Sequence, residues 1–164
     1  MQARLARGSV LRQVAGMPVL LRPMRAADLP AIQALWVAAW QAAMPEIDFA
    51  ARRAWLAPHL ENLHDAGAVT LCAVADTRVV GFLSWFPATG LIEQLAVHPA
   101  HSGHGIGGTL LDAVKRERPA GLHLLVNQEN PRAVAFYRRA GFAIREAGIN
   151  PGGSRPIWRM AWAS

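Results

Sequence analysis

The sequence predicts a single α/β domain with a mixed sheet and flanking helices, and three observations lead to this fold class. Apolar residues recur at every second position in some segments and every third or fourth in others, so predicted strands and helices alternate along the chain. The length of 164 residues suits one domain of ordinary size. Hydrophobic residues make up 52% of the chain and charged residues 17%, which supports a core and excludes a disordered chain.

Residues 1–16 are predicted to be a basic extension that precedes a domain at residues 17–164. The extension holds Arg4, Arg7 and Arg12, no acidic residue and no regular apolar period. We expect it to be poorly ordered or to reflect a misassigned start, with Met17 as the alternative start. Without it, 14 basic residues face 11 acidic ones, so the charge falls from +6 to +3 and gives little support to nucleic-acid binding.

The first third of the chain is predicted to hold one strand and two helices. Residues 19–22 form the strand, and Asp28 then offers an N-cap to a helix that ends near Pro45. A second helical region follows at 48–64, bent near Pro58. The apolar face of the first helix comprises Leu29, Ile32, Trp36, Trp40 and Ala43. We expect the two tryptophans to pack in the core rather than line a binding site.

The middle of the chain changes to strand periodicity. Residues 69–75 and 78–86 form a hairpin around Asp76-Thr77, and residues 91–97 form a third strand. A helix then runs to about Arg118, and a short strand follows at 122–126.

The C-terminal third is predicted to hold one helix and a terminal hairpin. Asn130 caps the helix, and Gly141 ends it as a left-handed residue. The hairpin pairs residues 142–146 with 156–163. One face of its last strand carries Trp158, Met160 and Trp162, which we assign to the core, with a substrate pocket or a homodimer contact as the alternatives.

A glycine-rich loop between the strand at 91–97 and the next helix is the strongest chemical signal. Its glycines, at 103, 105, 107 and 108, let backbone N–H groups converge, and the helix N-terminus adds partial positive charge. This arrangement favours a phosphate ligand such as a pyrophosphate. The glycines also match the G-x-G-x-x-G dinucleotide fingerprint, with Glu129 as the acid that binds a ribose. We keep that interpretation as a weak alternative, because five residues separate the strand from the first glycine.

Two motifs in this region resemble those of the GNAT superfamily of acetyl-CoA-dependent N-acetyltransferases. The first, the acyl-CoA motif, comprises Leu95, Val97, Pro99, Ser102, Gly105 and Gly107, followed by Leu110 and Leu111. The second comprises Asn130, Ala133, Phe136, Tyr137, Gly141 and Phe142. The resemblance covers about nine-tenths of the chain. It implies a mostly antiparallel mixed sheet in which a splayed parallel strand pair holds the cofactor.

The resemblance also implies which residues bind acetyl-CoA. Backbone groups of Leu95, Ala96 and Val97 bind the pantetheine arm, and one of their N–H groups polarises the thioester carbonyl. The loop that holds the pyrophosphate comprises Gly103, His104, Gly105, Ile106, Gly107 and Gly108. Asn130 bonds the cofactor arm besides capping its helix. Ser102 stands where the family prefers arginine or glutamine, so it brings a hydroxyl but no charge.

Glu93 and Tyr137 are the candidate catalytic residues. Glu93 is the only acid between Asp76 and Asp112, and strict alternation puts it on one strand face with Leu91 and Leu95. We assign it as general base, direct or through water, with a structural glutamate as the alternative. The resemblance assigns Tyr137 as the acid that protonates the departing thiolate, against a purely structural tyrosine. The expected reaction is direct attack of a primary amine on the thioester in a ternary complex, because no serine or cysteine nucleophile signature is present.

Several ligands and partners are not expected. His98, His101 and His104 recur every third residue but lie in a loop without cysteine or carboxylate partners, so we predict no metal. Cys72, the only cysteine, lies in an apolar run and is expected to be an inert thiol in a cytoplasmic protein. No membrane span or nucleic-acid partner is expected.

The acceptor of the acetyl group stays open. A small-molecule amine, a peptide N-terminus and a protein lysine all fit, although the small number of acidic residues disfavours a polycationic acceptor. The alternative function is a non-catalytic acyl-CoA sensor of the same fold.

Overall fold

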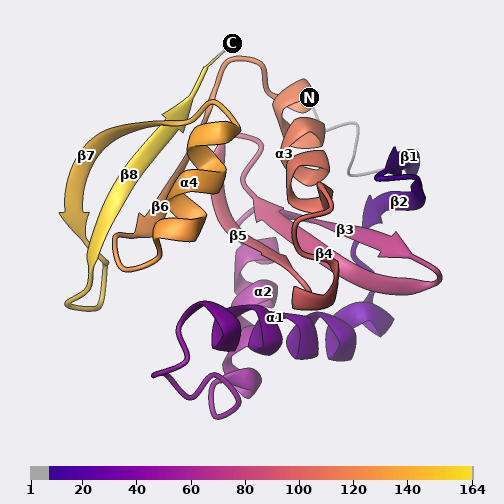
Figure 1. The fold of residues 1–164 in the computed structure, drawn as a ribbon, viewed down its shortest axis with the longest axis horizontal. Helices are drawn as coiled ribbons and strands as arrows, with labels where there is room; N and C mark the ends of the chain where they lie inside the picture. Colours follow the sequence, from indigo (N-terminus) through magenta and orange to yellow (C-terminus); the bar gives the residue numbers. More distant parts are fainter. Residues whose placement is uncertain (1–7, 164) are drawn as a thin grey trace.

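The computed structural model describes residues 8–163 and shows one eight-stranded sheet with helices on both faces (Figure 1). The helices are α1 (Leu29–Ala43), α2 (Arg53–Asp65), α3 (Ile106–Glu117) and α4 (Pro131–Arg139). The strands are β1 (Val10–Val14), β2 (Met17–Pro23), β3 (Val69–Ala75), β4 (Arg78–Trp85), β5 (Leu91–Val97), β6 (Leu122–Asn127), β7 (Ala143–Ile149) and β8 (Pro156–Trp162). The predicted fold class is confirmed.

The strand order is β1-β2-β3-β4-β5-β6-β8-β7. Every neighbouring pair is antiparallel except β5 and β6, which run parallel because α3 crosses over between them. The sheet therefore has the mixed, mostly antiparallel character that was expected.

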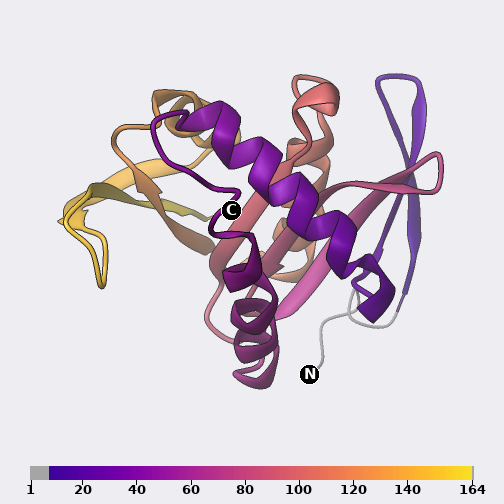
Figure 2. The same ribbon diagram turned by 90° about the horizontal axis from the view of Figure 1, so that it is seen from below.

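Two apolar clusters cover opposite faces of the sheet. One is formed with α3 and α4 and includes Leu110, Leu111 and Met160. The other is formed with α1 and α2 and includes Ile32, Trp36 and Leu56. Figure 2 shows α1 and α2 together on one side of the sheet. Trp36 is buried, as predicted, while Trp40 is half-buried and stacks on a neighbouring phenylalanine.

The predicted central hairpin is confirmed in detail. β3 and β4 are joined by Asp76 and Thr77, whose φ angles are 46° and 66°. Two consecutive residues with positive φ are typical of the tight turns whose twist matches that of the strands.

The expectation that the N-terminal extension is poorly ordered is wrong for residues 10–16. β1 pairs with β2 from Val10 opposite Leu21 to Val14 opposite Met17, and Val14 is buried. The segment lacks a strong period because most of its side chains are exposed, and the register with β2 fixes its conformation instead. Residues 1–7 lie outside the described residues.

Asp28 does not cap α1 through its side chain, contrary to prediction. Its carboxylate instead accepts two hydrogen bonds from the Arg22 guanidinium, at 2.6 and 2.8 Å, and one from the Arg25 backbone N–H at 2.7 Å. The pair is buried, and the hydrogen bonds from Arg22 lower the pKa of Asp28 despite the opposing effect of burial. This ion pair ties the start of α1 to β2.

Among the described residues, no helix has both the length and the apolar character needed to cross a bilayer.

Candidate active site

The site is centred on an opening between β5 and β6. These strands pair only at Leu91 opposite His123 and Ile92 opposite Leu124. Beyond Ile92, β5 stays paired with β4 while β6 stays paired with β8. One edge of β5 therefore faces the opening instead of a strand, so its backbone groups are free to bind an extended, amide-containing ligand. The splayed parallel pair that the resemblance implied is present.

The glycine loop lies at the end of β5 and leads into α3. Gly103 and Gly105 have φ angles of 81° and 89°, a conformation that glycine adopts without strain, and Gly105 is the N-cap of α3. Side chains added at Gly103 or Gly108 would meet nothing within 4 Å, so the backbone is open there. Ile106 is buried and can offer only its backbone N–H. The first turn of α3 carries no acidic residue. This cradle fits a pyrophosphate.

Close packing holds α3 against α4. A Cβ at Gly107 would lie 3.1 Å from Cζ of Phe136, so the glycine allows the two helices to approach each other. The predicted cap is confirmed, because the Asn130 side-chain oxygen accepts a hydrogen bond from the Ala133 N–H at 3.1 Å. The cap leaves the Asn130 amide nitrogen available to a ligand.

Tyr137 lies on α4, where its half-buried side chain packs against the apolar cluster on the α3 and α4 side. Its ring contacts Phe136 and Phe142 edge to face, with centroids 5.2 and 5.7 Å apart. Burial raises the pKa of the Tyr137 phenol, which therefore keeps its proton and can act as a hydrogen-bond donor.

Glu93 lies on the opposite side of the sheet, and the expected alternation is wrong at this residue. Ser84 faces Gln94 while Trp85 faces Ile92, so Glu93 is the extra residue of a β-bulge. Leu95 packs with the α3 and α4 cluster. On the other face, Glu93 contacts α2 and Gln94 contacts α1. Glu93 therefore does not share a face with Leu95. The bulge breaks the twofold alternation and aims two consecutive polar side chains the same way.

His59 of α2 is a partner of Glu93 that the sequence analysis missed. Its Nε2 lies 3.2 Å from Oε1 of Glu93, and its ring stacks on Trp55 with centroids 4.2 Å apart. The Trp36 indole N–H donates to the Gln94 side-chain oxygen at 3.2 Å. The His59–Glu93 and Trp36–Gln94 contacts span 34 and 58 residues of sequence, so no local pattern predicts them.

Arg132 is the second missed residue. It lies in the first turn of α4, and its Nη2 donates a 2.7 Å hydrogen bond to Oγ of Ser102 in the loop before α3. One signal for it was available in the sequence, because Arg132 is a cation in the first turn of a helix, where the helix dipole disfavours positive charge.

The structure thus gathers the predicted residues into two groups around one opening. Ser102, the loop at 103–108, Asn130 and Tyr137 lie with α3 and α4. Glu93 lies with α1 and α2. His98 and His101 contact each other edge to face, and the described residues contain no cluster of three or more His, Cys, Asp or Glu side chains suited to a metal ion.

Comparison with known proteins points to the same family as the sequence motifs. Residues 66–144, which contain the opening, the loop, α3 and α4, match the model of the acetyltransferase (GNAT) domain. The peptidyl-lysine N-acetyltransferase YiaC of Escherichia coli (strain K12) is 28% identical over 143 residues, which cover 87% of this chain and 96% of that protein. Together these matches support a GNAT superfamily acetyltransferase.

Solved structures of the superfamily show the same fold. The PaiA N-acetyltransferase from Thermoplasma acidophilum, solved with coenzyme A, has a TM-score of 0.72 at 19% identity and covers 89% of this chain and 99% of that chain. The ribosomal-protein-alanine N-acetyltransferase from Brucella melitensis has a TM-score of 0.62 at 26% identity and covers 88% and 99%.

Proposed function

We propose that this protein transfers an acetyl group from acetyl-CoA to a primary amine by direct attack within a ternary complex. The observation that carries the proposal is the opening between β5 and β6, with a carboxylate on one side and a phenol and a phosphate cradle on the other. An amine and a thioester can then meet within the opening from opposite sides of the sheet.

On the cofactor side, the chain's own backbone supplies most of the binding groups. When bound, acetyl-CoA supplies the activated acetyl group as a thioester. N–H groups of the loop at 103–108 bind its pyrophosphate, and the free edge of Leu95, Ala96 and Val97 binds its pantetheine arm. An N–H group on this edge, positioned before the reaction, also stabilises negative charge on the carbonyl oxygen. Asn130 adds a side-chain donor at the start of α4.

On the acceptor side, Glu93 removes the proton that blocks the nucleophile. An alkyl ammonium group with a pKa near 10.4 is deprotonated in only about one molecule per few thousand at pH 7. The Glu93 carboxylate, which lies on the α1 and α2 side of the opening, accepts this proton directly or through one water. The His59 ring, fixed by its stacking on Trp55, orients the carboxylate.

Tyr137 acts on the leaving group. Because burial raises its pKa, the phenol is protonated throughout the physiological range and can donate a hydrogen bond or a proton to a thiolate. Phe136 and Phe142 contact the ring edge to face and hold it in place.

A primary amine is the acceptor class that this chemistry requires. YiaC is named for peptidyl-lysine and the Brucella melitensis protein for ribosomal-protein alanine, and both names describe primary amines presented by a polypeptide. We therefore place peptide and protein amines first among the acceptors to be tested.

The test combines binding with turnover. Thermal shift with acetyl-CoA, CoA and NAD measures which cofactor the fold recognises, and release of free thiol with a panel of lysine peptides, N-terminal peptides and small amines measures transfer. We expect stabilisation by both CoA forms and thiol release that depends on an amine. Stabilisation by CoA without thiol release for any amine would favour an acyl-CoA sensor, and stabilisation by NAD alone would overturn the proposal.

A further inference from the structure

Ser102 stands where the family prefers arginine or glutamine, so the phosphate loop has no arginine or lysine of its own. The loop and the first turn of α3 have no acidic residue, so nothing there repels an anion. Ser102 offers an anion only a hydroxyl group. A cation that reaches this point from elsewhere in the fold would fill the gap.

Arg132 is such a cation. Its guanidinium donates to Oγ of Ser102 at 2.7 Å, although the two residues are separated by thirty positions in sequence. Ser102 is half-buried and Arg132 is exposed, so the arginine lies over the loop from the solvent side. The ion pairs of the described residues involve Arg22, Arg155, Arg159 and His59, and none of these pairs includes Arg132.

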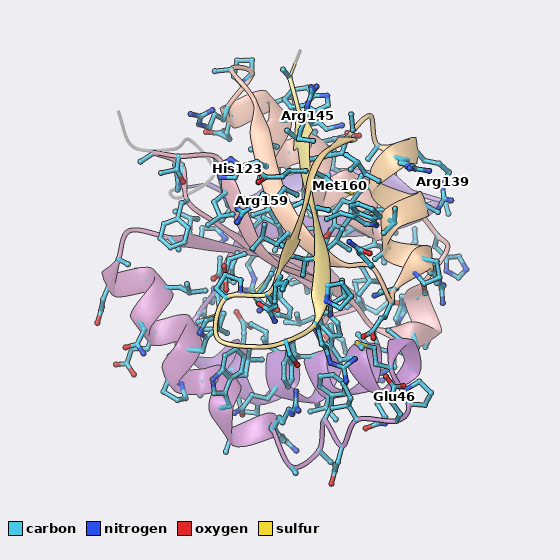
Figure 3. The ribbon with its side chains drawn as sticks, turned by 90° about the vertical axis from the view of Figure 1, so that its left-hand side faces the viewer. Glu46, His123, Arg139, Arg145, Arg159 and Met160 are labelled. Atoms are coloured by element: carbon cyan, nitrogen blue, oxygen red, sulfur yellow. The ribbon has the colours of Figure 1, made fainter. Side chains whose placement is uncertain are left out.

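The place of Arg132 on its helix argues against a role in stabilising α4. It follows Pro131 in the first turn, where the helix dipole disfavours a cation. The basic residues of the last turn, Arg138 and Arg139, lie where a cation stabilises the helix. Figure 3 shows Arg139 on α4 at the outer edge of the molecule. Helix stability therefore explains Arg139 but not Arg132.

We infer that Arg132 binds the pyrophosphate of CoA and supplies, from α4, the charge that Ser102 does not supply from the loop. On binding, one guanidinium N–H group bonds a phosphate oxygen in place of, or beside, the Ser102 hydroxyl. A guanidinium can bond phosphate through two N–H groups, which makes it stronger than a neutral donor at this position. The inference rests on the proposed function in one respect, the binding of CoA at this loop.

The experiment measures the affinity for CoA and for 3′-dephospho-CoA by isothermal titration calorimetry. Arg132→Ala is compared with Arg139→Ala, which removes the same charge from the same helix about 10 Å farther along it. We expect Arg132→Ala to weaken CoA binding by about tenfold or more, as for the loss of a hydrogen bond to a charged group. Arg139→Ala should stay within about twofold of the unsubstituted protein. The loss should be the same with 3′-dephospho-CoA, because both ligands carry the pyrophosphate.

A relocation variant gives the sharpest control. Ser102→Arg introduced into the Arg132→Ala protein returns a guanidinium to the loop itself and should restore most of the lost affinity. Circular dichroism and melting temperature show that each variant folds.

Three results would overturn the inference. Equal affinities for Arg132→Ala and Arg139→Ala, or a loss that disappears with 3′-dephospho-CoA, would contradict a pyrophosphate contact while leaving the proposed function intact. Failure of the unsubstituted protein to bind either ligand would instead remove the proposed function, and the inference with it.

Discussion

The cofactor side and the acceptor side of the opening are built in different ways. The cofactor side consists of the loop after β5, α3 and α4, and its central contacts are backbone groups and glycines close together in sequence. The acceptor side consists of α1, α2 and the bulge in β5, and side chains from distant segments hold it together. The family match at 66–144 covers the first and leaves α1 and α2 outside. The proposed cofactor side thus rests mainly on a local glycine motif, and the proposed acceptor side on contacts between side chains far apart in sequence.

The largest expected effect comes from the acceptor side. Glu93→Gln keeps the shape of the side chain but removes the base, so kcat/KM for the amine should fall by about 10²–10⁴. Affinity for CoA should stay unchanged, because Glu93 lies on the other side of the sheet. Steady-state kinetics and calorimetry measure the two quantities.

Glu61→Gln serves as the matched control, since Glu61 is an exposed carboxylate on α2. Full turnover by Glu93→Gln would remove its assigned role and favour a structural glutamate. A parallel loss of CoA affinity would show that the two sides are not independent.

The next effect concerns the ion pair that anchors α1. Asp28→Asn leaves the buried Arg22 guanidinium without its counter-ion, and the free energy of unfolding at pH 7 should fall by about 3 kcal/mol. The folded-state pKa of Asp28 is lowered, so the carboxylate contributes to the free energy of unfolding above the unfolded-state pKa near 3.8. This contribution is lost as the pH falls through the folded-state pKa. Urea unfolding at pH 7 and at pH 3 should therefore show a difference that shrinks in acid. The exposed Asp65→Asn should show little difference at either pH.

Tyr137→Phe tests the chemical contribution of the cofactor side. The ring keeps its contacts with Phe136 and Phe142, so stability and CoA affinity should hold while kcat falls by about 100-fold. This loss is the lower end of the about 10²–10⁴-fold range for a general acid, because a phenol whose pKa is raised by burial is a weak acid. An unchanged kcat would assign Tyr137 to packing alone.

A smaller effect tests the packing of the cofactor side. A Cβ at Gly107 would crowd the Phe136 ring at 3.1 Å, whereas one at Gly108 would meet nothing. Both substitutions gain the same helix propensity, so their difference isolates the crowding. Gly107→Ala should be less stable than Gly108→Ala by about 1–3 kcal/mol in urea unfolding. Equal stabilities would show that α4 moves freely relative to α3.

The smallest expected effect concerns the support of Glu93. His59→Leu removes the ring that orients the carboxylate, and kcat/KM for the amine should fall by about threefold to tenfold with CoA affinity unchanged. The exposed His64→Leu on the same helix is the control. A rate equal to that of the control would assign the His59 contact to structure only.

Much of the fold could be predicted from the sequence, because the turns, caps and strand patterns that define it are local in the chain. The bounds of β3 and β5, the hairpin at Asp76 and Thr77 and the cap at Asn130 were each predicted from a few neighbouring residues. β1 was not predicted, because a mostly exposed edge strand has no apolar period and gains its conformation from pairing with β2.

The candidate site divides in the same way. The loop at 103–108, Asn130 and Tyr137 could be named as candidates because glycines, a cap and a motif are spaced along a short stretch of chain. The face of Glu93 could not, because one extra residue in β5 reverses the alternation and is visible only in the register with β4.

The sequence by itself was enough to indicate the GNAT resemblance, the glycine loop and the candidate residues Glu93 and Tyr137, since the motifs that point to them lie at short spacing. Only the tertiary structure decided which charges and rings meet across the opening. Arg132 reaches Ser102, His59 reaches Glu93, and Arg22 rather than the helix end takes the carboxylate of Asp28. The physical reason is that hydrogen bonds and ion pairs act over a few ångströms of space, whatever the number of residues that separates the partners along the chain.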